Sequence, residues 1–147
     1  MLKYNERVKG ASDQDINMWE VYFSQSIPTD YRHFLKNSDG PSVYDDETDC
    51  EFQFFSVRQT IDYFGEKLKE SCPSAIPICK DSKGNVAVYR FEHTIYDGIY
   101  VMSSSEIDWD KATGIGKTIQ DLLQINIEAK VREKGVEVLK DRTSNLD

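Results

Sequence analysis

The segment Thr113–Thr118 has the residues of a phosphate-binding site, because its two glycines lead into a lysine and a threonine. Such a P-loop needs another glycine five positions before Gly116, where this chain has Lys111, and it needs a strand before it and further strands after it. No strand-like segment follows in the sequence. We therefore interpret the segment as a flexible turn leading into a helix that Thr118 and Asp121 are spaced to cap.

A second candidate is an acidic run in which Asp45, Glu47, Asp49 and Glu51 occupy alternate positions, loosely like a calcium-binding loop. A calcium loop needs glycine at its sixth position for the sharp turn, and Cys50 stands there. The sequence predicts a solvated acidic loop over residues 42–51 instead, and the functional version of such a loop is a docking surface for a basic partner.

Nucleophilic and metal chemistry have little support. Cys50, Cys72 and Cys79 form no C-x-x-C pair and have no histidine close in sequence, and Ser103–Ser105 lacks the glycines of a nucleophile elbow. The two histidines lie far apart and match no metal-ligand spacing. We expect no enzymatic activity, no cofactor and no bound metal.

Composition limits the class of protein. The 147 residues are 39% hydrophobic and 12% aromatic, enough for one core, and no run of apolar residues is long enough to cross a membrane. The first residues lack the apolar stretch of a signal peptide, and an odd number of cysteines suits a reducing compartment, so we expect a cytoplasmic protein. A net charge of −8, concentrated before residue 111, disfavours nucleic-acid binding and favours a basic protein partner.

Hydrophobic periodicity indicates the elements that must position these residues. Predicted helices cover about 13–24, 29–39, 57–69 and 116–134, the last with Ile119, Leu122, Ile127 and Val131 on one face. Expected caps are Ser12 for the first helix, Thr29 or Asp30 for the second and Ser56 for the third, with Gly40 and Gly135 ending the second and fourth. Predicted strands cover about 52–55, 76–78, 86–91 and 94–102, and Pro77 suits an edge strand or a strand start. This pattern predicts an α+β fold, a mostly antiparallel sheet with helices packed around it, in a single domain over 1–140 followed by a frayed polar tail over 141–147.

Two stretches carry a resemblance to a known family. Ile27–Gly40 resembles the "LP-x-D-Y-x-x-F-L-x-x-x-N-G" signature of the SUKH superfamily, and Ile76–Asn85 resembles its "I-P-I-x-x-D-x-x-G-N" turn. The matching residues are Ile27, Pro28, Asp30, Tyr31, Phe34, Leu35, Gly40, Ile76, Pro77, Ile78, Asp81, Gly84 and Asn85. These residue types make helix starts, buried faces and tight turns, so the resemblance concerns architecture first.

The resemblance also implies a function. The superfamily groups the yeast cell-wall-assembly regulator with bacterial immunity proteins, which bind and neutralise toxin domains of polymorphic or contact-dependent systems. Many such toxins are nucleases with basic clefts, which an acidic inhibitor can occupy. The residues predicted to contact the partner are the densest run of acids and its aromatic neighbours: Tyr44, Asp45, Asp46, Glu47, Asp49, Glu51 and Phe52. Two alternatives stay open, a regulatory protein-binding scaffold without a toxin partner and a ligand-binding or enzymatic domain whose site assembles only in three dimensions.

Overall fold

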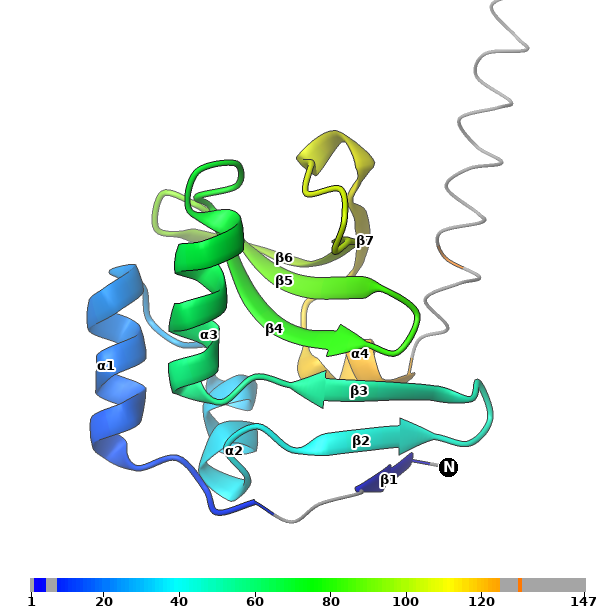
Figure 1. Cartoon of the computed structure of the whole chain (residues 1–147). Helices are drawn as coiled ribbons and strands as arrows, with labels where there is room; N and C mark the ends of the chain where they lie inside the picture. The colour runs from blue at the N-terminus through cyan, green and yellow to red at the C-terminus, as the bar shows by residue number, and fades with distance from the viewer. Residues whose placement is uncertain (1, 5–7, 125–129, 131–147) are drawn as a thin grey trace, which may run out of the picture.

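A computed structural model describes residues 2–4, 8–124 and 130, which form one antiparallel sheet with helices against it (Figure 1). Its strands, in the order of the chain and of the sheet, are β1 (Leu2–Tyr4), β2 (Ser42–Asp45), β3 (Cys50–Phe54), β4 (Ala75–Asp81), β5 (Asn85–Glu92), β6 (Ile95–Ser103) and β7 (Thr113–Gly116). The helices are α1 (Asp13–Phe23), α2 (Thr29–Asn37), α3 (Val57–Tyr63) and α4 (Ile119–Gln124), with a π-helical turn η1 (Phe64–Leu68) after α3 and a 3-10 turn η2 (Trp109–Lys111) before β7. The predicted α+β class is confirmed.

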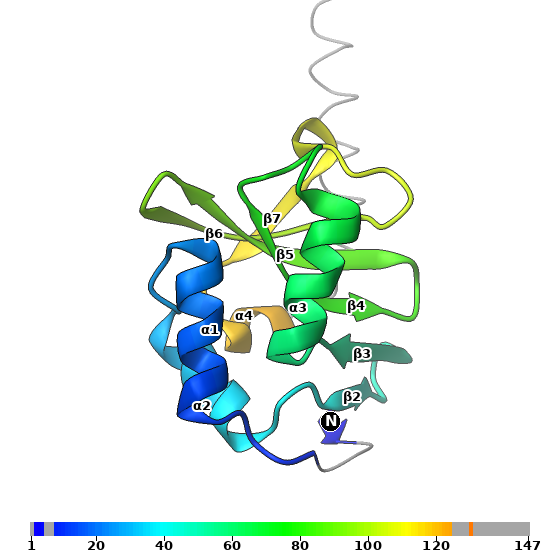
Figure 2. The same cartoon turned by 60° about the vertical axis from the view of Figure 1, so that its left-hand side comes forward.

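The side chains of β5 belong to two core clusters, one on each face of the sheet, because alternate side chains of a strand point to opposite faces. Tyr89 packs in a cluster with Trp19 of α1, Tyr31 of α2 and residues of α4. Its neighbour Val88 packs in a second cluster with Leu68 of η1. Burying an aliphatic side chain such as Val88 or Leu68 contributes about 1.5–3 kcal/mol to stability, and buried side chains cover both faces of the central strands. The helices α1 and α3 run side by side (Figures 1 and 2).

Local capping confirms two helix starts. The Ser12 hydroxyl accepts from the amide of Asp15 at 3.1 Å, and the Asp15 carboxylate accepts from the amide of Ser12, which makes a capping box at α1. The same reciprocal pair begins α3, where Ser56 accepts from the amide of Gln59. Each box satisfies amide groups that a helix N-terminus leaves without partners.

The predicted cap of α2 is wrong. Pro28 occupies the N-cap position, and no side chain caps that end of the helix. The carboxylate of Asp30 accepts instead from the amide of Ile119 at 2.8 Å, so it caps the start of α4 across the molecule. Gly40 after α2 has the expected positive φ, 91°, and a Cβ there would meet the backbone nitrogen of Ser56 at 2.7 Å.

Three strands were not predicted. Residues 42–51, expected as a loop, include β2 and the start of β3, and only 46–49 form the turn between them. The strand β1 pairs with β2, and the glycine-rich segment expected as a flexible turn forms β7 against β6. The helix cap after β7 is confirmed, since Thr118 and Asp121 bond each other's backbone amides at 3.1 Å.

The position of Pro77 also differs from the prediction, because β4 lies between β3 and β5 inside the sheet. On the β3 side the register runs only from Asp81 to Cys79, and the last bond joins the amide of Phe55 to the carbonyl of Ile78. On the β5 side the register shifts between Pro77 and Cys79. A proline is tolerated at such an irregularity because no ladder bond there requires its missing N–H.

The last predicted helix is described only for α4, where Ile119 and Leu122 are buried as expected. The predicted apolar positions Ile127 and Val131, the expected stop at Gly135 and the tail 141–147 lie outside the described residues. No helix in the described residues has the length and apolar character needed to cross a membrane.

Candidate functional site

The turn between β2 and β3 lies at the end of these strands where Asp45 pairs with Cys50, and we call residues 44–51 the acidic hairpin. Its shape comes from Asp45, whose carboxylate accepts from the amide of Glu47 at 3.1 Å and from the hydroxyl of Thr48 at 2.9 Å. Asp49 takes a positive φ of 51°, which aspartate tolerates better than most side chains. The acids of this run therefore include one that forms the turn and others that the turn presents outward.

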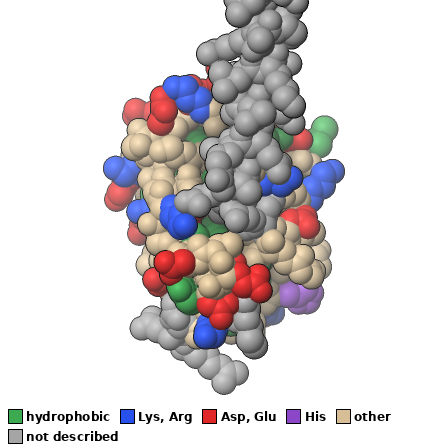
Figure 3. Space-filling model, turned by 90° about the vertical axis from the view of Figure 1, so that its right-hand side faces the viewer, with side chains coloured by type: hydrophobic (Ala, Val, Ile, Leu, Met, Phe, Trp, Pro, Cys, Tyr) green, Lys and Arg blue, Asp and Glu red, His purple; other side chains and the backbone are tan. Residues whose placement is uncertain are grey.

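Four carboxylates of the acidic hairpin are exposed: Asp46, Glu47, Asp49 and Glu51. Figure 3 views the end of the molecule where this turn lies and shows acidic side chains gathered on its lower half. Asp46 lies 3.6 Å from Lys3 of β1, and the Lys83 ammonium donates to the carbonyl of Thr48 at 3.4 Å. The acidic hairpin itself contains five acids and no lysine or arginine, so it is negatively charged.

Polar contacts across the strands fix the outward face of the hairpin. Tyr44 donates from its hydroxyl to the Asp49 carboxylate at 2.6 Å, and this hydrogen bond raises the pKa of Tyr44. Ser42 donates to the Glu51 carboxylate at 2.6 Å. Tyr44 and Asp45 are half-buried. The ring of Tyr44 therefore lies beside the exposed acids, as its predicted role as an anchor requires.

The predicted contact role of Phe52 is wrong for this conformation. Its side chain is 2% exposed and belongs to the core cluster that includes Val43 and Phe54. In β3 alternate residues face the core, so Phe52 points inward while Glu51 and Gln53 point to solvent. The sequence prediction had begun a strand at Phe52 but still named it as a contact because it follows the acidic run; the alternation of that strand buries its side chain.

The second signature stretch ends in a turn that contacts the acidic hairpin. The Asp81 carboxylate accepts from the amides of Lys83 and Asn85 at 3.0 and 2.8 Å and from the Asn85 side chain at 2.9 Å. Gly84 completes this turn with a φ of 86°. The other signature positions are core or capping residues: Ile27, Tyr31, Leu35, Ile76, Pro77 and Ile78 are buried, Phe34 packs on Phe54, and Asp30 caps α4.

Ser82, in the middle of this turn, is a supporting residue that the sequence reasoning missed. Its hydroxyl accepts from the amide of Glu51 at 3.0 Å, and its amide donates to the carbonyl of Glu51 at 2.8 Å. The β4–β5 turn thus holds the base of the acidic hairpin in place. The sequence signal was available only as a turn motif, because nothing in it indicates which strand lies alongside.

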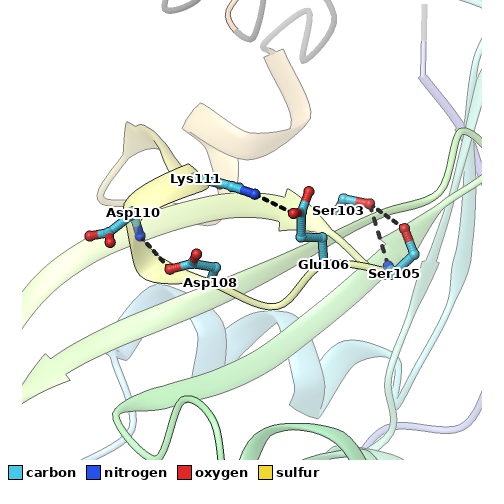
Figure 4. A network of polar contacts seen from close by, with 6 residues as sticks. All are labelled: Ser103, Ser105, Glu106, Asp108, Asp110 and Lys111. Atoms are coloured by element: carbon cyan, nitrogen blue, oxygen red, sulfur yellow. Dashed lines mark hydrogen bonds and ion pairs between the residues drawn. The ribbon is translucent and has the colours of Figure 1, made fainter.

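The other chemistry-bearing residues are dispersed. Cys50, Cys72 and Cys79 are unpaired and buried, and burial raises the pKa of each thiol. Ser103 and Ser105 bond each other in the loop before β7, where Lys111 pairs with Glu106 (Figure 4). Within residues 2–4, 8–124 and 130, no group of three or more His, Cys, Asp or Glu side chains is arranged to hold a metal ion.

Comparison with known proteins identifies a family. A family model described as SMI1 / KNR4 family (SUKH-1) matches residues 10–125, a span that includes both signature stretches and the acidic hairpin. A search of curated proteins finds no match to this chain.

Proposed function

Because the chain belongs to the SMI1 / KNR4 family (SUKH-1), we propose that it is an immunity protein that binds and neutralises the toxin domain of a bacterial polymorphic or contact-dependent toxin system. Membership of this family is consistent with a toxin-immunity role. The proposal adds that the partner is a basic domain, in the first place a nuclease, and that the protein acts in the cytoplasm by binding, without catalysis.

The acidic hairpin is the observation that supports the basic partner. It presents Asp46, Glu47, Asp49 and Glu51 from one turn, and the hydrogen bonds of Asp45 and Ser82 hold that turn. A nuclease cleft binds phosphates with lysine and arginine, so carboxylates at similar spacing can compete for the same groups. A turn already held in shape loses less conformational entropy on binding, which favours affinity.

Charge also predicts how the partner would be captured. Opposite charges steer two proteins together and raise the association rate, mainly at low ionic strength. Tyr44 offers an aromatic surface among these charges, and tyrosine is among the residues that contribute most to protein interfaces. Both features belong to a binding surface and need no reacting group.

The first experiment is co-purification of the tagged chain from its native source. A retained protein with a basic toxin domain, whose activity is lost on binding, would support the proposal. Recovery of cellular regulatory proteins alone would favour the alternative of a regulatory scaffold without a toxin partner.

The second experiment tests the surface, through the quadruple variant Asp46→Asn, Glu47→Gln, Asp49→Asn and Glu51→Gln. It leaves Asp45 in place because that side chain forms the turn. Association with the captured partner, followed by stopped-flow at low salt, should slow by about tenfold or more, and the difference should shrink as salt is added. The dissociation rate should change less.

A matched control neutralises four exposed acids elsewhere: Asp62, Glu66, Glu70 and Asp110. It changes the net charge equally but leaves the hairpin intact. Equal slowing in both variants would show that net charge alone matters and would remove the acidic hairpin from the interface.

A further inference from the structure

A groove of about 510 Å³ opens at the end of β4 and β5 that lies away from the acidic hairpin. Phe23, Ile76 and Phe91 give it an apolar lining, and Ser74 and Glu92 are among its polar residues. Its volume falls within the range of about 300–1,000 Å³ that is usual for binding pockets. Neither the acidic hairpin nor the residues that hold it line this groove.

Hydrogen bonds hold the three segments that form the groove. The side chain of Gln25, after α1, donates to the carbonyl of His93 at the end of β5. The amide of Phe91 donates to the carbonyl of Ser74 at 3.1 Å, and the indole of Trp109 donates to the hydroxyl of Ser74 at 3.1 Å. The groove is therefore formed before anything binds in it.

Trp109 lies in the turn η2 before β7, and Figure 4 shows the hydrogen bonds and the ion pair that hold this segment. The Asp108 carboxylate accepts from the amide of Asp110 at 3.0 Å, and Lys111 pairs with Glu106. These contacts fix the short turn η2 that carries the indole to Ser74.

The charges beside the groove favour a cation. The Arg90 guanidinium lies 4.5 Å from the centre of the Trp109 ring, and it faces Glu92 at 3.2 Å and Asp97 at 3.9 Å. The single positive charge of Arg90 is therefore shared by two carboxylates. The Glu92 side chain is 61% exposed, so it can also reach a bound molecule. An added anion would meet a net negative charge here, whereas a lysine or arginine could pair with Glu92.

Two exposed apolar side chains are close in sequence to residues that line the groove. Tyr22, 44% exposed, precedes Phe23 in the last turn of α1. Ile95, 70% exposed, begins β6 two residues after His93. An apolar lining such as Phe23, Ile76 and Phe91 give this groove is typical of a surface that contacts another protein.

We propose that this groove binds a basic peptide segment of a partner protein, with an aromatic or aliphatic side chain beside Phe23 and Ile76 and a lysine or arginine against Glu92. The proposal rests on the groove alone, so it stands or fails separately from the role of the acidic hairpin.

The test is an NMR titration of the full chain carrying the four hairpin neutralisations, so that charge attraction to the hairpin is removed. The probes are acetyl-Lys-Phe-Lys-amide, acetyl-Lys-Ser-Lys-amide and acetyl-Glu-Phe-Glu-amide. The first should shift the amide signals of Gln25, Ser74 and Glu92 in a saturable way. The second should bind more weakly because it lacks the apolar side chain, and the third should not bind because its charge is repelled.

Two test variants, each with a matched control, connect the shifts to the groove. Pro73→Tyr, at an exposed lining position, should obstruct the groove and weaken binding of the first probe by about tenfold, equivalent to 1.4 kcal/mol. Ser71→Tyr, two residues earlier and outside the groove, should leave it unchanged. Glu92→Gln should weaken binding by about threefold, as expected for an exposed ion pair, and Glu66→Gln should have no effect.

Three results would overturn the proposal: equal binding of the acidic probe, shifts that Pro73→Tyr and Ser71→Tyr affect alike, or no saturable shift with any probe. Concentration-dependent dimerisation that Pro73→Tyr abolishes would also overturn it, because the occupant would then be a second copy of this chain.

Discussion

Asp30 illustrates how one carboxylate can join elements that lie far apart in the chain. It sits in the first turn of α2, yet its partner is the amide of Ile119, 89 residues later. The bond satisfies one of the amides that the start of α4 would otherwise leave without a partner, and it is partly buried. A hydrogen bond to a charged group in such a place is worth more than one between neutral groups.

We expect Asp30→Ala to lower the free energy of unfolding by about 1–2 kcal/mol, because it removes a charged cap from α4. Urea denaturation followed by circular dichroism would measure the loss. Asp30→Asn keeps an oxygen acceptor and should recover part of it. The control Asp62→Ala, on the exposed face of α3, should change stability by less than about 0.5 kcal/mol, and an equal loss in both variants would contradict the capping role.

At the scale of elements, periodicity predicted the parts of this fold whose side chains are strongly patterned. The helices over Asp13–Phe23 and Val57–Tyr63 and the strands around Val88 and Val101 were expected because their apolar residues recur at regular spacing. The strand β2 was not, since Ser42–Asp45 has a single aliphatic residue and leads into acids. Its pairing with β1 is long-range and leaves no local signal, and its hairpin with β3 turns through acids that resemble a loop.

In the candidate site, too, the residues marked by a local pattern could be predicted and those that depend on long-range pairing could not. The acids and Tyr44 could be selected from sequence because their density is local. Ser82 could not, because its contact with Glu51 depends on the pairing of β3 with β4. Phe52 was chosen as a contact because it is an aromatic neighbour of the acids, although the predicted strand at 52–55 left open which face its side chain occupies; the structure buries it.

Packing between elements gives a second prediction, at Gly10. The chain before α1 lies against the end of α2, where the amide of Ala11 donates to the carbonyl of Leu35 and the amide of Asp39 donates to the carbonyl of Lys9. A Cβ on Gly10 would lie 1.8 Å from the carbonyl oxygen of Lys36. Gly10→Ala must therefore separate these segments.

Calorimetry or urea titration should show that Gly10→Ala costs about 2 kcal/mol or more. Gly65→Ala provides the matched control, since a Cβ there meets nothing within 4 Å and lies in the helical turn η1, where alanine is preferred to glycine. It should be neutral or stabilising by up to about 1 kcal/mol. A Gly10→Ala protein as stable as the Gly65→Ala protein would contradict the close packing.

Strand pairing and packing differ between the centre of the sheet and the side formed by β1 and β2. The strands β4, β5 and β6 pair over their length and are packed on both faces, whereas β1 and β2 are short and lie at one side of the sheet. Local opening is expected first where pairing is short and solvent lies on one face. Two thiols lie in these two parts, because Cys50 is at the hairpin end of β3 and Cys79 is within β4.

We expect iodoacetamide to modify Cys50 before Cys79 in the native protein. Both are buried, with 6% and 1% exposure, and burial raises the pKa of both thiols, so reaction must wait for opening. Mass spectrometry of timed samples would give the order, and concentrated guanidinium should remove the difference and expose Cys72 as well. Simultaneous modification of Cys50 and Cys79 in native buffer would mean that the sheet opens only as a unit.

The identity of strand order and chain order has a consequence for synthesis in the cell. Each strand after β2 pairs with the one made just before it, so the sheet can grow as the chain leaves the ribosome, without waiting for a distant segment. The strand β1 has the longest wait, because both α1 and α2 are made before its partner β2. During translation β1 can therefore pair only once β2 has emerged, whereas every later strand finds the strand beside it already made.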